Sequence, residues 1–148
     1  MRTAVQWVRA QIYHDVVAAG FEDLGRFHVG MFSFPTPDGL RPTVLADQLG
    51  ITKQSVNNLL RDLEGRGYLH RVPDPTDGRA RVIHLTAKGR RLEAVVYDAA
   101  EAAEQGIAEL LGPRRFAQFR RSLEEVAGHI ASGELLIHRR GASSDSPS

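Results

Sequence analysis

Residues 45–89 read LADQLGITKQSVNNLLRDLEGRGYLHRVPDPTDGRARVIHLTAKG, and this segment gives the clearest indication of the architecture. Its first part predicts two helices separated by a tight break. Gly50 lies where a left-handed residue ends a helix, and the hydroxyl of Thr52 can cap the start of the next one. The second helix runs over residues 52–66 and is closed by Gly67. A helix, a tight turn and a second helix in this order indicate a helix-turn-helix.

The helix over residues 52–66 carries two stripes of opposite character. Its aliphatic residues follow the spacing i, i+3, i+4 and i+7, which buries one face of a helix. They are Val56, Leu59, Leu60 and Leu63. Polar residues follow the same rule two positions earlier, about 200° around the helix, so they point outward. Amide and guanidinium groups suit base edges in the major groove, whereas carboxylates would repel phosphate. The candidate DNA contacts are Thr52, Lys53, Gln54, Ser55, Asn57, Asn58 and Arg61. The alternative is a polar surface helix without a partner.

After Gly67 the periodicity changes from helix to strand. Residues 68–72 and 80–85 are rich in β-branched and aromatic side chains and flank the turn formers of residues 73–78. They predict an antiparallel hairpin of two or three strands with a long tip. Behind a helix-turn-helix such a hairpin is a wing. Arg79 and Arg81 would lie near its tip, within reach of phosphates or a minor groove.

Amphipathic helices are expected on both sides of this core, from apolar residues that recur every three or four positions. The expected helices are residues 3–19, residues 22–34, one capped by Thr43, a long one capped by Thr86, and a last one after Gly112-Pro113. The fold class is therefore mostly α with a small antiparallel β wing (α+β). Residues 1–138 are expected to form a single domain, and the small polar tail over residues 139–148 is expected to be disordered.

Composition and charge restrict the function further. The chain has 148 residues and no cysteine, which excludes disulfides and thiolate metal sites. No leader and no membrane-spanning apolar run is expected, so the prediction is a cytoplasmic protein without a membrane partner. Residues 41–91 hold ten basic and five acidic side chains, a net +5, whereas the rest of the chain carries −4. A basic middle suits a polyanion, although chance clustering on a solvated surface is an equal alternative.

The sequence offers little for catalysis. Six histidines are present, but none has a recognised ligand spacing, and a metal site is not expected. No serine lies in a nucleophile-elbow pattern and no glycine-rich phosphate loop is present. We therefore expect neither an enzyme nor a cofactor.

The segment over residues 43–92 closely resembles the core of MarR-family transcriptional regulators. Its strongest signature is Asp77-x-Arg79, followed by Leu85-Thr86 and by Gly89. The resemblance implies a winged helix-turn-helix over residues 41–86 that binds DNA, with residues 52–66 as the recognition helix. It also implies that Arg79 enters the minor groove and that Asp77 orients the wing.

The same resemblance has implications outside the DNA-binding core. The terminal helices, about residues 1–34 and 87–138, would form the interface of a homodimer. A pocket between the two parts would accept a small aromatic or anionic effector. The candidate lining residues are Trp7, Tyr13, His14 and His28. For the aromatic pair, packing in the core or in the dimer interface is the alternative.

Together these observations predict a sequence-specific regulator of transcription that binds double-stranded DNA. A twofold dimer would address half-sites about 10 base pairs apart, so the operator should be palindromic. Repression by occupancy is the default mechanism, with release by an effector. The alternative from another functional class is a winged-helix module for protein–protein interaction that does not bind DNA.

Overall fold

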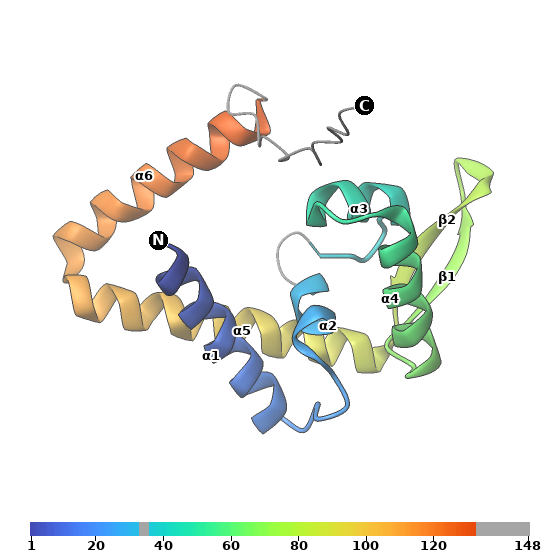
Figure 1. The fold of residues 1–148 in the computed structure, drawn as a ribbon, viewed down its shortest axis with the longest axis horizontal. Coiled ribbons are helices and arrows are strands. Elements are labelled where there is room, and N and C mark those ends of the chain that lie inside the picture. The colour runs from blue at the N-terminus through green and yellow to red at the C-terminus, as the bar shows by residue number, and fades with distance from the viewer. Residues whose placement is uncertain (33–35, 133–148) are drawn as a thin grey trace, which may run out of the picture. The chain divides into compact units, whose positions relative to one another are not determined.

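The computed structural model describes residues 1–32 and 36–132, so the predicted tail over residues 139–148 lies outside the described residues. The described part is mostly helical with one antiparallel hairpin, as the sequence predicts (Figure 1). In chain order the elements are α1 (Arg2–Ala18), α2 (Arg26–Met31), α3 (Pro42–Leu49), α4 (Lys53–Gly65), β1 (Leu69–Asp74), β2 (Asp77–Leu85), α5 (Ala87–Leu111) and α6 (Pro113–Ala131). No helix in residues 1–32 or 36–132 is long and apolar enough to cross a membrane. The chain forms two compact units, residues 1–104 and the residues from 105 onward, which we describe separately.

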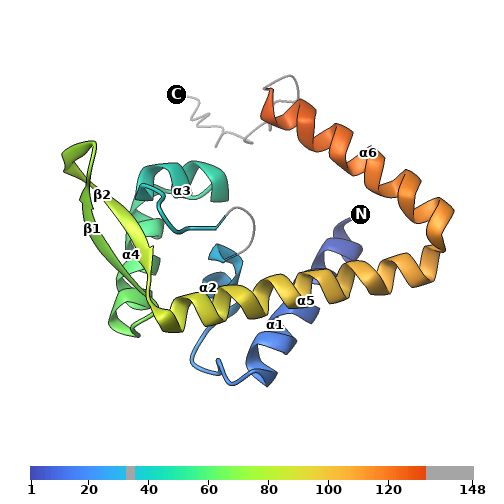
Figure 2. The same ribbon diagram turned by 180° about the vertical axis from the view of Figure 1, so that it is seen from behind.

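The first unit is built around one apolar core to which every one of its elements contributes. Val16 of α1, Leu60 of α4, Ile83 of β2 and Leu92 of α5 are all fully buried. Helices α3 and α4 pack against each other, and α4 contacts β1, as the front and back views show (Figures 1 and 2). The core thus holds the helix pair and the hairpin together.

Two of the three threonine caps are confirmed. The Oγ1 of Thr52 accepts a hydrogen bond from the backbone N–H of Ser55 at 3.1 Å, at the start of α4. The Oγ1 of Thr86 accepts one from the N–H of Gly89 at 3.1 Å, at the start of α5. The predicted cap at Thr43 is wrong, because α3 begins two residues earlier than such a cap implies, at Pro42, and has Arg41 in the capping position.

The second helix is shorter than predicted. It begins after Gly25 and ends at Met31, whereas the sequence pattern predicted residues 22–34. The backbone N–H of Gly25 donates to Nδ1 of His28 at 2.9 Å, which fixes the start of the helix at that point. Residues 33 and 34 lie outside the described part of the chain.

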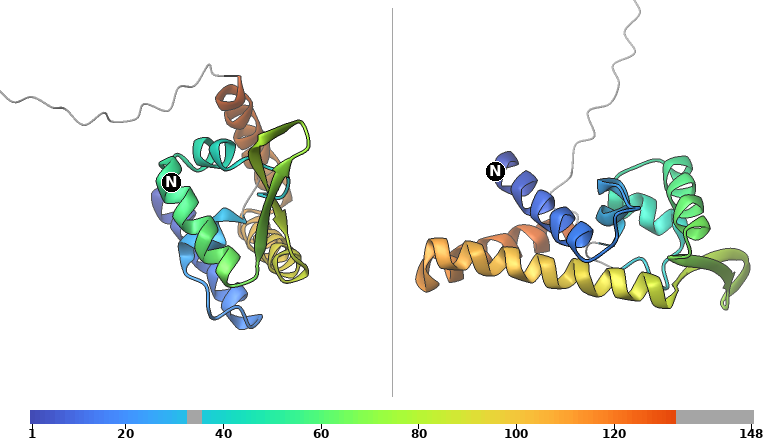
Figure 3. Two further views of the ribbon diagram at one scale, coloured as in Figure 1. Left: turned by 90° about the vertical axis from the view of Figure 1, so that its right-hand side faces the viewer. Right: turned by 90° about the horizontal axis from the view of Figure 1, so that it is seen from below.

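The hairpin has longer strands and a tighter tip than the pattern suggested. Its register pairs Leu69 with Leu85 and continues to Pro73 opposite Arg81, with an irregularity before Asp74. The prediction that Pro73 lies in the tip is wrong, because Pro73 pairs with Arg81 within the sheet. Proline has no backbone N–H to donate, but β1 tolerates it at this position. Figure 3 shows the hairpin projecting from the first unit.

The segment that leads into α3 is fastened to the outer side of the hairpin. The N–H of Gly39 donates to the carbonyl of Ile83 at 2.7 Å, and the N–H of Ile83 donates to the carbonyl of Leu40 at 2.9 Å. The carboxylate of Asp38 also accepts the N–H of Leu85 at 2.8 Å. The sheet has two strands, and this short pairing extends it at one edge.

Helices α1 and α6 leave apolar side chains exposed. Along the predicted face of α1, Val16 is fully buried but Val5 is 45% exposed. In the second unit, α6 begins after Gly112, which has φ 74°, and has no buried residue at all. Its exposed apolar residues recur at helical spacing and are Phe119, Leu123, Val126 and Ile130.

Candidate nucleic-acid interface

Helix α4 carries most of the candidate DNA contacts, so the directions of its aliphatic and polar stripes are decisive. Val56, Leu60 and Leu63 have no exposed surface, so the aliphatic stripe faces the core. The opposite stripe is exposed at Gln54, Asn58 and Arg61, while Asn57 is half-buried. The helix therefore presents amide and guanidinium groups on its outer side, as predicted.

The polar side chains at the start of α4 divide into two groups. Thr52 and Ser55 bind each other, with 2.8 Å between their hydroxyl oxygens, and Thr52 also caps the helix. Lys53 and Gln54 are exposed and make no side-chain hydrogen bond within the described part of the chain. Lys53 and Gln54 are thus the groups at this end that are available to an external partner.

Further along α4 the polar stripe is partly ordered by contacts within the helix. The Nδ2 of Asn57 donates to the carbonyl of Lys53 at 3.0 Å. An Nη1 of Arg61 lies 3.4 Å from Oδ1 of Asn58. Such contacts restrict the rotamers of these side chains and leave amide and guanidinium N–H groups to donate outward.

The wing presents two arginines that have no acidic partner in the part of the chain that the structure describes. The ion pairs among the described residues include the guanidinium groups of Arg41, Arg66, Arg71 and Arg90, but neither Arg79 nor Arg81. Both Arg79 and Arg81 are exposed. Because no carboxylate in residues 1–32 or 36–132 neutralises their charge, they are suited to phosphate or to a minor groove.

The sequence assigned Asp77 a role in orienting the wing, and the structure gives this residue a suitable contact. Its Oδ1 accepts the backbone N–H of Arg79 at 3.1 Å. A carboxylate that holds the N–H two residues later fixes the local turn, as aspartate commonly does in loops. The side chain of Arg79 then leaves the hairpin from a defined backbone position.

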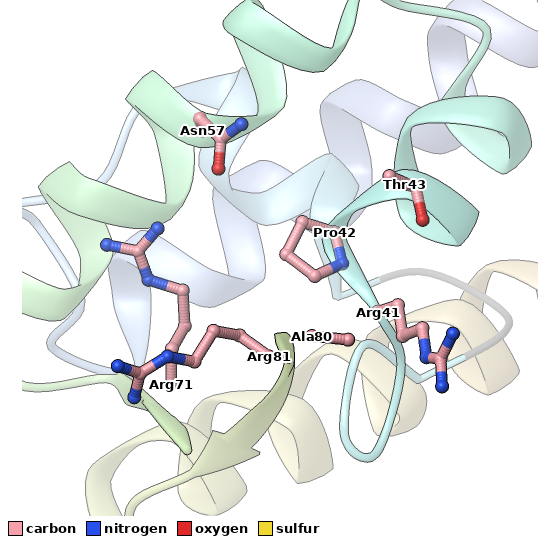
Figure 4. Close-up of a pocket in the computed structure, with 7 residues that line it drawn as sticks. All are labelled: Arg41, Pro42, Thr43, Asn57, Arg71, Ala80 and Arg81. Carbon is pink, nitrogen blue, oxygen red and sulfur yellow. The ribbon is translucent and has the colours of Figure 1, made fainter. Parts of the chain in front are cut away.

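A cavity of about 360 Å³ lies between the start of α3, helix α4 and the hairpin. Arg41 and Pro42 reach it from the segment that leads into α3, Asn57 from α4, and Arg71 and Arg81 from the strands (Figure 4). The guanidinium group of Arg41 points away from this hollow, and that of Arg71 is bound to Glu64, so Arg81 is the lining arginine that has no carboxylate partner among the described residues.

Two ion pairs at this cavity were not found from the sequence. Arg71 of β1 binds Glu64 of α4 with its backbone N–H at 3.1 Å and with its guanidinium Nη2 at 2.7 Å. These hydrogen bonds from Arg71 lower the pKa of the Glu64 carboxyl. The second pair joins Arg41 to Asp74 of β1, with Nε 2.6 Å from Oδ2. Spacing along the chain does not reveal such pairs, but an arginine in the capping position of α3 was a signal that could have been used.

The four candidates for an effector pocket lie in different surroundings. Trp7 is 49% exposed, and His14 is exposed beside Asp15. The hydroxyl of Tyr13 donates to the carbonyl of Leu24 at 3.1 Å. None of the four, His28 included, lines the cavity beside α3 and α4. An effector pocket at these residues stays a prediction.

His28 has a structural role that also fixes its tautomer. Its Nδ1 accepts the N–H of Gly25, so the ring proton resides on Nε2, which donates to Oδ2 of Asp62 at 2.7 Å. Asp62 also accepts from Arg66, and the hydrogen bonds from Arg66 and then His28 lower the pKa of the Asp62 carboxyl. His28 thus links α2 to α4 through its hydrogen bond to Asp62.

Comparison with known proteins agrees with this geometry. Residues 35–80 match the model of the MarR family. The HTH-type transcriptional regulator PetP of Rhodobacter capsulatus is 37% identical over 105 residues, which is 70% of this chain and 63% of that protein. An HTH-type transcriptional repressor of Mycobacterium tuberculosis is 38% identical over 92 residues, 60% of this chain and again 63% of the relative. Each match therefore spans less than two thirds of the relative's own length.

The fold is also found in solved structures. The structure of FabT from Streptococcus pneumoniae in complex with DNA superposes with a TM-score of 0.70 over 88% of this chain and 94% of that one, at 20% identity. A winged helix-turn-helix overlaps the region of the family match. The chain is thus similar to MarR-family proteins in sequence and in fold.

Proposed function

We propose that this chain is a transcriptional regulator that binds duplex DNA in a sequence-specific manner. The observation that carries the proposal is the division of α4 into an aliphatic side, on which Val56, Leu60 and Leu63 are fully buried, and an exposed stripe of Gln54, Asn58 and Arg61. Amides and guanidinium groups can read base edges in the major groove. The relatives named as transcriptional regulator and repressor support the proposal and favour a regulator over an enzyme.

The wing supplies the second half of the interface. Arg79 and Arg81 are exposed and have no carboxylate partner among the described residues, so they would reach the minor groove or the backbone beside the recognition helix. Neutralised phosphates release counterions, so binding should weaken steeply as salt concentration rises. The proposed contacts are Thr52, Lys53, Gln54, Ser55, Asn57, Asn58 and Arg61 of the recognition helix and Asp77, Arg79 and Arg81 of the wing.

The proposed assembly is a homodimer through the terminal helices. The exposed apolar face of α6 and the exposed Val5 and Trp7 of α1 support it, because such surface is normally covered by a partner. A twofold dimer would read a palindromic operator with half-sites about 10 base pairs apart. We further propose repression by occupancy, in the cytoplasm, with release by a small aromatic or anionic effector, for which Trp7, Tyr13, His14 and His28 are the candidate lining residues.

Sequence selection from a random duplex library with the purified full chain tests the function. The expected result is a palindromic consensus, bound with an affinity that falls steeply with salt. A Gln54→Ala variant should select a consensus that differs at one symmetric pair of positions. The absence of any enriched sequence, with binding to a protein partner that salt does not affect, would instead support a protein-interaction module.

A further inference from the structure

Helix α3 begins with an arginine in the position where a capping residue is favoured. Arg41 has the extended backbone of a cap, with φ −76° and ψ 144°, but its side chain makes no capping hydrogen bond. Serine, threonine, aspartate and asparagine are preferred there because an oxygen can accept the orphan N–H groups of the first turn. A guanidinium group has no acceptor atom. The side chain of Arg41 must therefore serve another purpose.

That side chain reaches the tip of the hairpin. The Nε and Nη2 of Arg41 both lie 2.6 Å from Oδ2 of Asp74, and Nη2 is 3.4 Å from the hydroxyl of Thr76. Asp74 is only 7% exposed, although it is charged. Its other oxygen, Oδ1, accepts the N–H of Thr76 at 2.8 Å and the hydroxyl of Thr76 at 2.7 Å. Both carboxylate oxygens are thus fully used.

Asp74 lies where it can control the rest of the wing. It ends β1 and pairs with Asp77, the first residue of β2. Asp77 in turn holds the N–H of Arg79. A two-stranded hairpin has little stability of its own, so its tip needs an attachment to the helical body to keep one position. The contact from Arg41 to Asp74 supplies such an attachment.

We infer that the Arg41–Asp74 pair fixes the tip of the wing to the start of α3 and thereby sets the position of Arg79 relative to α4. Arg41 and Asp74 are positioning residues in this inference, which rests on the proposed function for its effect on DNA binding. Arginine at position 41 provides no side-chain cap for α3, but its guanidinium group holds the wing through Asp74.

A competing explanation is that Arg41 simply contacts a DNA phosphate, and an Asp74→Asn variant separates the two. Asparagine keeps an Oδ1 that can accept from Thr76, but it removes the ion pair and one negative charge. If Arg41 acted only on phosphate, the loss of Asp74 would strengthen DNA binding. If the pair positions the wing, the affinity for the selected operator should fall, on the order of tenfold.

The matched control is Asp47→Asn on α3. Asp47 is exposed, makes no side-chain hydrogen bond within the described residues, and its replacement causes the same change in charge. Its affinity for the operator should equal or slightly exceed that of the unmodified chain. The inference is overturned if Asp74→Asn binds the operator as tightly as Asp47→Asn.

Amide hydrogen exchange provides a measurement that does not depend on DNA. In the Asp74→Asn and Arg41→Ser variants, the N–H groups of Thr76 and Arg79 should exchange several times faster than in the unmodified chain. The N–H of Ile83, which binds the carbonyl of Leu40, should be unchanged and serves as the internal reference. Serine at position 41 can also cap α3, and this cap should offset part of the stability that the loss of the ion pair to Asp74 removes.

The two measurements separate a failure of this inference from a failure of the proposed function. Unchanged exchange at Thr76 and Arg79 in both variants would overturn the inference even if the chain binds its operator. If the unmodified chain bound no duplex of any sequence, the proposed function would fall together with the effect on DNA. Faster exchange would then still show that Arg41 and Asp74 hold the wing.

Discussion

The first turn of α5 comes very close to the backbone of Tyr68, the residue just before β1, at the position of Gly89. A Cβ at Gly89 would lie 2.0 Å from the carbonyl oxygen of Tyr68 and 3.3 Å from Cβ of Leu85. The carbonyl cannot turn away easily, because it accepts the N–H of Thr86 at 3.0 Å and the side chain of Tyr68 is fully buried. We therefore expect a Gly89→Ala variant to push the first turn of α5 away from the backbone of Tyr68.

The size of this effect follows from two opposing contributions. Overpacking a tight site costs about 1–3 kcal/mol, and a rigid backbone partner places Gly89→Ala at the upper end of that range. Replacing glycine by alanine inside a helix is favourable by about 1 kcal/mol, which offsets part of this cost. The free energy of unfolding should therefore fall by about 2 kcal/mol, which lowers Tm by roughly 4–8 °C for a chain of this size.

Urea denaturation followed by circular dichroism, at one fixed protein concentration, measures this difference. The matched control is Gly65→Ala at the end of α4, where an added Cβ would meet nothing within 4 Å. This control should be as stable as the unmodified chain or more stable by up to about 1 kcal/mol. Equal stabilities for Gly89→Ala and Gly65→Ala would refute the close approach of α5 to Tyr68.

Other substitutions test the interface and the caps. Arg79→Ala should weaken binding to all duplexes and reduce the slope of log K against log salt by about 0.9. The slope should be unchanged in Arg26→Ala on α2, and no difference between these two variants would argue against a wing contact. Gln54→Ala should cost about 1–3 kcal/mol at one base pair, measured by competition with singly changed operators; equal losses on random DNA would contradict base reading. Thr52→Ala should lower the free energy of unfolding in urea by about 1 kcal/mol, because α4 loses its cap, and an unchanged midpoint would count against that cap. The hydrogen bonds from Thr76 and then from Arg41 hold the pKa of Asp74 at about 2, below its ordinary 3.8. The contribution of this carboxylate to the stability of the fold is therefore complete above about pH 4 and is lost as the pH falls through about 2. An NMR titration of the carboxyl carbon checks this, and a midpoint near 4 would contradict it.

The part of the fold that the sequence predicted best is governed by local rules. The caps at Thr52 and Thr86 and the buried stripe of α4 depend on residues within one or two turns of each other, so spacing alone reveals them. The exposed side of α4 followed directly from the buried side. The exposure of Gln54, Asn58 and Arg61 agrees with that spacing, whereas Asn57 is half-buried, and contact of these residues with DNA stays a prediction.

The features that the sequence missed depend on contacts between distant residues. Arg41 and Asp74 are 33 positions apart, and no periodicity connects them. The expected cap at Thr43 failed because Pro42 is well suited to the first position of a helix, which moved the start of α3. The predicted tip of the hairpin is too long because proline is common in turns, whereas Pro73 pairs within the sheet.

The backbone pairing of residues 39 and 40 with Ile83 has a consequence for protein engineering. A hybrid regulator with altered operator preference is most simply made by transplanting the exposed positions of α4 alone, since the scaffold beneath them stays intact. A graft with a junction between residue 40 and residue 83 would instead take one member of each hydrogen-bonded pair from a different parent. The smallest portable block that keeps the wing with its own supports therefore begins before Asp38 and extends past Arg90, two side chains that also bind each other.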